Sequence, residues 1–81
     1  MTRNEIDRAL REIFADIFDQ APESFDYETN PDTLLNWDSL AHLRLIAALE
    51  ERFAITISPE DQVDMLSFEL MGDLLAELTE V

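Results

Sequence analysis

The sequence contains no cysteine and only five basic residues among 81, and each scarcity excludes a class of protein. Without cysteine there can be no disulfide framework and no thiolate metal site. The five basic residues are all arginine and do not cluster, whereas nucleic acids and anionic membranes require a basic face. No apolar run approaches the length of a membrane span, and residues 1–5 lack the apolar stretch of a secretory signal. We therefore expect a cytoplasmic protein that binds no nucleic acid and inserts into no membrane.

The acidic residues number 19 and give the chain a formal net charge of −14. Such a surface suits basic partner proteins, through steering and complementary rims, or it serves solubility alone. The length allows one domain over residues 1–81, and the 47% of apolar residues supplies one modest core. We expect this domain to be a monomer.

The hydrophobic pattern predicts an all-α fold, a small bundle of three main helices and one short helix with a long first loop. The first helix is expected at about residues 3–18, where Thr2 and Glu5 make a capping-box pattern. Prolines and turn-forming residues interrupt the helical pattern over residues 19–37. One helical turn is possible around residues 31–35. The residues that indicate that this loop packs down are Phe25, Tyr27, Leu34, Leu35 and Trp37.

The second half of the chain carries three further helix signals. Asp38 is a suitable N-cap for a helix over residues 39–53, which contain neither glycine nor proline. Ser58, followed by a proline and two acids, announces a short third helix, and Ser67 is expected to cap a fourth. The residues expected to reach the core from the third helix are Val63 and Leu66.

The helix over residues 39–53 has apolar residues on two faces. Its expected core face consists of Leu45, Ile46, Leu49 and Phe53. Leu40, Leu43 and Ala47 fall on nearly the opposite side. One side of a helix in a small bundle should face water, so this second stripe indicates docking to a partner, although single surface leucines are common. The charged residues that flank the stripe are Arg44, Glu50 and Glu51.

Ser39 occupies the first helical position, at the junction with the long loop. Its hydroxyl is expected to be exposed, beside free backbone N–H groups and the positive end of the helix dipole. An attached anionic group such as a phosphodiester would be favoured there.

The tripeptide Asp38-Ser39-Leu40 at a loop-to-helix junction is the motif that carries a family resemblance. The helix continues with Leu43, Leu45, Ile46, Leu49, Glu50 and Phe53. With the passage Ile55-Thr56-Ile57-Ser58-Pro59-Glu60 into the short third helix, these residues resemble the acyl carrier proteins. The resemblance covers essentially the whole chain.

The resemblance implies that Ser39 receives 4′-phosphopantetheine from coenzyme A and that acyl groups are carried as thioesters on its terminal thiol. Asp38 would cap the helix and assist magnesium during the transfer. The stripe of Leu40, Leu43 and Ala47 would dock partner enzymes, and the core face of the same helix would wall the core into which some acyl chains fold. The implied partners are a phosphopantetheinyl transferase, an acyl-loading ligase or acyltransferase, and a ketosynthase or other acyl-processing enzymes.

The subtype is less defined than the family. Carriers of fatty-acid synthesis usually bear acids where this chain has Ala41 and Arg44, and peptidyl carriers usually have paired glycines where it has Asn36 and Trp37. The Trp-Asp-Ser-Leu string with His42 nearby is more similar to stand-alone carriers of specialised pathways, which load short, hydroxylated or unusual acyl units. Three alternatives stay open: a fatty-acid or polyketide-like carrier, a peptidyl or aminoacyl carrier, and a non-carrier acidic helical adaptor that binds a protein through the stripe.

No metal site and no catalytic centre is expected, so the chain is not expected to be an enzyme. His42 is the only histidine, and without companions it is poor evidence for a metal ligand. A packed or hydrogen-bonded structural imidazole is the simpler interpretation, with a role beside the prosthetic phosphate as the other. No oxyanion motif or glycine turn accompanies Ser39 and His42 as a nucleophile and base.

Overall fold

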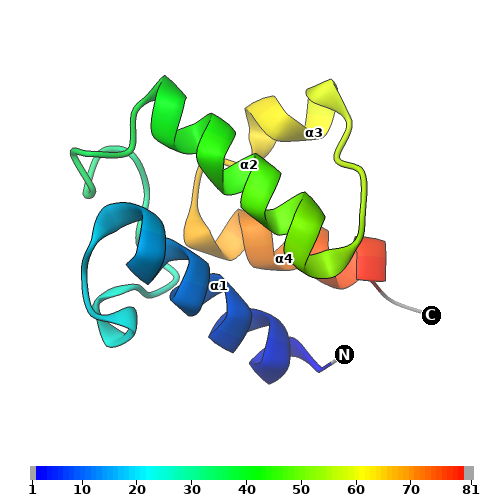
Figure 1. The fold of residues 1–81 in the computed structure, drawn as a ribbon, viewed down its shortest axis with the longest axis horizontal. Coiled ribbons are helices and arrows are strands. Elements are labelled where there is room, and N and C mark those ends of the chain that lie inside the picture. The colour runs from blue at the N-terminus through cyan, green and yellow to red at the C-terminus, as the bar shows by residue number, and fades with distance from the viewer. Residues whose placement is uncertain (1, 80–81) are drawn as a thin grey trace.

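A computed structural model describes residues 2–79 of the chain. Within that range all regular structure is helical, which confirms the predicted all-α bundle with a long first loop (Figure 1). The elements are α1 (Arg3–Phe18), the short 3-10 helix η1 (Pro22–Ser24), α2 (Ser39–Phe53), α3 (Pro59–Asp64) and α4 (Phe68–Thr79).

Each α-helix begins at a polar side chain that satisfies free backbone N–H groups. Thr2 and Glu5 form both halves of a capping box at α1. The side chains of Asp38, Ser58 and Ser67 each accept a hydrogen bond from the backbone N–H three residues later. The predicted bounds of the first two long helices are therefore confirmed.

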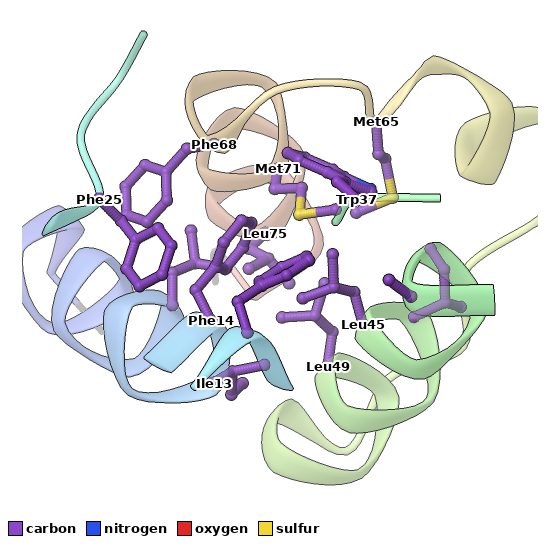
Figure 2. Close-up of a cluster of buried hydrophobic side chains, with 14 of the residues drawn as sticks. Ile13, Phe14, Phe25, Trp37, Leu45, Leu49, Met65, Phe68, Met71 and Leu75 are labelled. Atoms are coloured by element: carbon purple, nitrogen blue, oxygen red, sulfur yellow. The ribbon is translucent and has the colours of Figure 1, made fainter. Parts of the chain in front are cut away.

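The core is centred on the ring of Phe14 in α1 (Figure 2). This ring meets those of Phe25, Trp37 and Phe68 at centroid distances of 5.3, 5.4 and 5.3 Å. The loop before α2 thus contributes to the same cluster as α1 and α4, which confirms that the loop packs down at Phe25 and Trp37. The aliphatic residues that complete the cluster from α2 and α4 are Leu45, Ile46, Leu49, Met71 and Leu75, with Phe53 half-buried beside them.

The long first loop is held at both of its ends and in its middle. Phe25, Leu34 and Trp37 are buried, and the carbonyl of Thr29 accepts a hydrogen bond of 2.9 Å from the N–H of Phe68, the first residue of α4. The stretch over residues 31–35 forms hydrogen-bonded turns and no helix.

Three apolar residues lie elsewhere than the sequence indicated, and Tyr27 is only partly packed down: it is 43% exposed, with its ring near Phe68 and its hydroxyl bonded to Asp7. Leu35 was expected to pack down and is 88% exposed, because its neighbours Leu34 and Trp37 take the inward positions of an irregular backbone. Val63 and Leu66 were expected in the core and are exposed, Val63 by 68%. The short α3 turns this side outward, and Met65 just after it enters the core instead.

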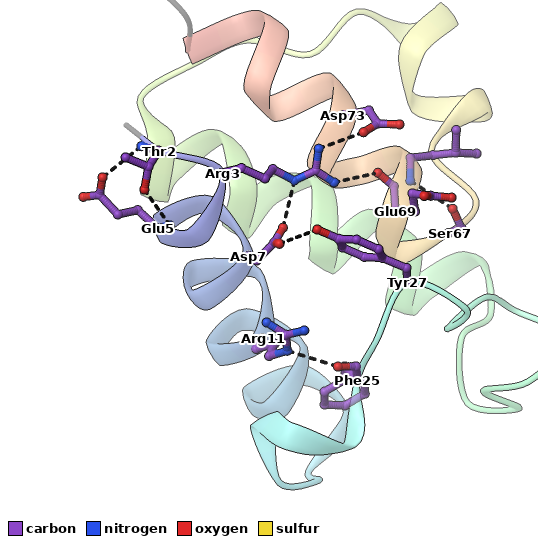
Figure 3. Close-up of polar contacts among 11 residues, drawn as sticks. Thr2, Arg3, Glu5, Asp7, Arg11, Phe25, Tyr27, Ser67, Glu69 and Asp73 are labelled. Atoms are coloured by element: carbon purple, nitrogen blue, oxygen red, sulfur yellow. Dashed lines mark hydrogen bonds and ion pairs between the residues drawn. The ribbon is translucent and has the colours of Figure 1, made fainter.

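A polar cluster joins α1, the loop and α4 on another side of the bundle (Figure 3). The Arg3 guanidinium donates to Asp7 at 3.0 Å and to Asp73 at 2.8 Å, and reaches the Glu69 carbonyl at 3.4 Å. The Tyr27 hydroxyl donates to the other oxygen of Asp7 at 2.6 Å. The carboxylates of Asp73 and Asp7 raise the pKa of Arg3 and keep its charge in place. The buried Asp7 side chain is thereby fully partnered.

Among the described helices, none combines the length and the apolar character that a bilayer span requires.

Candidate functional site

Ser39 is the first residue of α2 and its side chain is exposed. The carboxylate of Asp38 accepts from the Ala41 N–H at 2.9 Å, and the Asp38 carbonyl accepts from the His42 N–H at 2.9 Å. The N–H groups of Ser39 and Leu40 have no carbonyl acceptor within the helix, because the helix begins at Ser39. They therefore point out of its N-terminal end. The backbone thus offers partial positive charge beside an accessible hydroxyl.

An open groove of about 620 Å³ lies next to Ser39, between α2, α3 and the end of the first loop. Most of its lining is apolar. The side chains that form it besides Asp38 and Ser39 include Pro31, Trp37, His42, Leu43, Val63 and Leu66. A hydroxyl at the edge of such a groove can carry a flexible substituent that lies along an apolar wall.

His42 holds the three elements around this groove together. The indole N–H of Trp37 donates to His42 Nδ1 at 3.0 Å, and His42 Nε2 lies 2.7 Å from the carbonyl oxygen of Gln62 in α3. An indole N–H can only donate, so Nδ1 is the acceptor and the ring proton lies on Nε2, which donates to Gln62. This geometry confirms the structural interpretation of His42, a half-buried imidazole with both nitrogens occupied.

The second apolar stripe of α2 is exposed as the sequence indicated. Leu40 is 64% and Leu43 is 60% exposed, and Ala47 is exposed one turn further along. The face therefore presents apolar surface that the bundle itself does not cover. Surfaces of this kind on a small protein mark sites of interaction.

The charged residues around the stripe differ in exposure and in whether the bundle itself provides their side chains with a partner. Arg44 and Glu51 are exposed, and neither makes an ion pair within residues 2–79. Glu50 is half-buried, and its carboxylate accepts a hydrogen bond of 2.8 Å from the N–H of Ile57 in the loop before α3. Ala41 is buried, so it contributes no charge to this rim.

Sequence reasoning missed the far wall of the groove. Val63 and Leu66 were assigned to the core, but they face Leu43 across the groove beside Ser39. Val63 belongs to a helix of six residues and Leu66 lies two residues beyond its end, so no helical period in the sequence could assign either side chain to a face.

The part of the chain that the structure describes contains no group of three or more histidine, cysteine or acidic side chains arranged to hold a metal ion. Asp38 is exposed beside Ser39, so its carboxylate is accessible to an ion brought by another molecule.

A comparison with protein families matches residues 8–78 to the family described as "Phosphopantetheine attachment site". The match covers both walls of the groove, Ser39 and all of α2. A comparison with curated proteins gave no match.

Proposed function

Because the chain belongs to the phosphopantetheine attachment site family, whose members carry 4′-phosphopantetheine covalently, we propose that Ser39 is the residue that holds this group. The observation that carries the proposal is the exposed Ser39 hydroxyl at the N-terminus of α2, at the edge of a groove with a largely apolar lining.

The other described serines fit less well. The hydroxyls of Ser58 and Ser67 are occupied as helix caps, and Ser24 ends a 3-10 turn away from any α-helix N-terminus. Ser39 alone among them combines a free hydroxyl with the start of a long helix.

The residues around Ser39 fit the chemistry of the group. The Ser39 oxygen would become the ester oxygen of a phosphodiester, and the free N–H groups at the start of α2 would stabilise its negative charge. Asp38 keeps α2 capped during the transfer and offers its carboxylate to a magnesium ion that accompanies coenzyme A. When bound, the group supplies a thiol that forms thioesters with acyl units. Trp37, Leu43 and Val63 provide an apolar wall beside the attachment point.

We propose that the stripe formed by Leu40, Leu43 and Ala47 docks the enzymes that serve the carrier. These are a phosphopantetheinyl transferase, an acyl-loading ligase or acyltransferase, and acyl-processing enzymes such as a ketosynthase. Arg44 and Glu51 contribute charges of both signs at the rim of this face, whereas Glu50 supports it by holding the loop after α2. The exposed Arg44 distinguishes the face from a uniformly acidic one and favours a carrier of a specialised pathway.

In this function the chain is a monomeric, cytoplasmic carrier without activity of its own. A peptidyl or aminoacyl carrier is the second candidate, because the thiol of the same prosthetic group can hold an amino acid as a thioester. A non-carrier adaptor that uses only the stripe is the third.

The deciding experiment is intact mass after incubation with coenzyme A and a broad-specificity phosphopantetheinyl transferase. The wild type should gain one phosphopantetheine, Ser39→Ala none, and the control Ser24→Ala as much as the wild type. A gain that persists in Ser39→Ala would move the attachment site elsewhere. No gain by a folded wild type would favour the adaptor. Offering the loaded chain fatty, amino and short hydroxy acids with their ligases then separates the carrier subtypes.

A further inference from the structure

A second groove, of about 180 Å³, lies between α3 and α4. The short α3 separates it from the groove at Ser39, since Gln62 and Val63 line the first groove and Asp61 and Asp64 line the second. Its apolar lining comes from Met65, Leu70 and Leu74. We refer to this feature as the α3–α4 groove.

The apolar lining of the groove includes two of three leucines that lie along one side of α4 and are not fully buried in the core. Leu70, Leu74 and Leu78 recur every fourth residue along α4 and so lie one above another on the helix. Leu70 is 48% exposed, Leu78 is exposed and Leu74 is half-buried. The core is served by a different line, which includes Met71 and Leu75. Like α2, α4 thus presents apolar surface to the outside.

All charged side chains that line the α3–α4 groove are acidic. Asp61 and Asp64 of α3 and Asp73 and Glu77 of α4 line it, and no basic side chain does. Within residues 2–79 only Asp73 of these four is in an ion pair, with Arg3 of α1. Three carboxylates therefore face solvent around an apolar strip without a cation of the chain's own.

We propose that the α3–α4 groove docks a basic amphipathic helix of a partner protein. Apolar side chains of that helix would lie against Leu70 and Leu74, and its lysines or arginines would meet the carboxylates contributed by both helices. The acidic lining repels anionic lipid and nucleic acid, so it selects a basic protein segment. This surface is separate from Ser39, and its occupant leaves the groove at Ser39 open to an enzyme.

The test uses the full chain, isotope-labelled, and a synthetic helical peptide. The peptide has about twelve residues, so that at about 1.5 Å per residue it matches the length of α4. The peptide carries leucines three and four residues apart on one face and lysine or arginine on both flanks. A peptide of the same composition with scrambled order is the control. Backbone amide shifts locate the bound peptide, and titration gives its affinity.

Two exposed leucines provide matched variants. Leu70→Gln alters the α3–α4 groove, and Leu40→Gln makes the same change on the exposed stripe of α2. We expect Leu70→Gln to lower the affinity about tenfold and Leu40→Gln to leave it unchanged. Asp64→Asn should lower it by about threefold and reduce its dependence on salt. Circular dichroism checks that each variant is folded.

Shifts confined to α3 and α4, together with the expected order of the variants, support the proposal. Shifts at Leu40 and Leu43 with sensitivity to Leu40→Gln would place the peptide on the exposed stripe of α2 and overturn the proposal. Equal binding of the amphipathic and scrambled peptides would mean that net charge alone causes binding, which overturns the proposal. No binding at all would overturn it as well. The readout needs no prosthetic group, so failure here and failure of carrier loading are distinguishable.

Discussion

Trp37 and His42 are joined by a hydrogen bond of 3.0 Å from the indole N–H to Nδ1, and their rings stack with an interplanar angle of 24°. The bond ties the last buried residue of the first loop to the second turn of α2. Because His42 also bonds the Gln62 carbonyl, the pair holds the loop, α2 and α3 in one arrangement around Ser39.

Replacing His42 with alanine should destabilise the fold. The substitution leaves the buried indole N–H of Trp37 and the Gln62 carbonyl without their partner, at a cost of about 1–3 kcal/mol. Urea unfolding should show a lower midpoint, and tryptophan emission should shift to the red. Arg44→Ala, an exposed change on the same helix, should stay within about 0.5 kcal/mol of the wild type. Equal midpoints for the two variants would contradict the bridging role of His42.

Two substitutions of Asp38 should separate its cap from its charge. Asp38→Ala removes the acceptor of the Ala41 N–H and should cost about 1 kcal/mol, whereas Asp38→Asn keeps an acceptor and should be nearly neutral. If the carboxylate assists a magnesium ion, Asp38→Asn should still slow phosphopantetheine transfer. Unfolding curves and loading rates measured on both variants test this. Loading of Asp38→Asn at the wild-type rate would confine Asp38 to capping.

Leu43→Asp should slow loading without unfolding the chain. Leu43 is largely exposed on the stripe, so an aspartate there disturbs no core contact but places a charge where a partner enzyme would bury apolar surface. We expect the kcat/KM of the transferase to fall about tenfold or more. Leu70→Asp, a matched change on α4, should load normally. A similar loss in both variants would mean that the stripe is not a specific docking face.

Gly72 and Arg3 should be energetically coupled. A Cβ at position 72 would lie 2.5 Å from Arg3 Nη2 and 2.9 Å from its Cζ, so the guanidinium must move away from its partners on Asp7 and Asp73. Gly72→Ala should gain about 1 kcal/mol of helix propensity and lose about the same from Arg3. After Arg3→Ala only the gain should remain. A double-mutant cycle in urea measures the coupling, and strict additivity would rule out this contact.

Alkaline pH should weaken the fold through Tyr27. The hydrogen bond to Asp7 raises the pKa of Tyr27, because ionising the phenol removes that bond and sets two negative charges side by side. A raised pKa in the folded state means that the stabilisation is complete below the unfolded value of about 10 and is lost as pH rises through the folded value. Tyr27 is the only tyrosine, so tyrosinate absorbance reports it alone. Tyr27→Phe should flatten the stability curve in this window, and an unchanged curve would contradict the assignment.

The helix bounds could be predicted because their causes are local. Thr2, Asp38, Ser58 and Ser67 are short polar side chains that bond N–H groups three residues away, and nothing distant competes with them. The exposed stripe of α2 was predictable for a similar reason, since fifteen residues are enough to define two faces by period.

The misplaced residues lie where the backbone has no period or too little of it. Leu34 and Leu35 are adjacent in a turn, and only tertiary packing decides that Leu34 is buried and Leu35 is not. Val63 lies in a helix of six residues, which is too short to reveal its faces, and Leu66 lies in the irregular segment after that helix. The bonds of Glu50 to Ile57 and of His42 to Gln62 depend on how the chain returns after α2, which composition does not encode.

Ser39 lies two residues after the buried Trp37 and one after the Asp38 cap, so its mounting on the bundle is stiff. Because the backbone at Ser39 is held in place, its motion adds nothing to the distance that a group attached to Ser39 can cover. If Ser39 holds the prosthetic group as proposed, the extended length of that group sets the distance over which cargo can be presented. Glycines inserted into the loop ahead of Asp38 would make this attachment point flexible. A partner would then receive the cargo in a range of orientations instead of one.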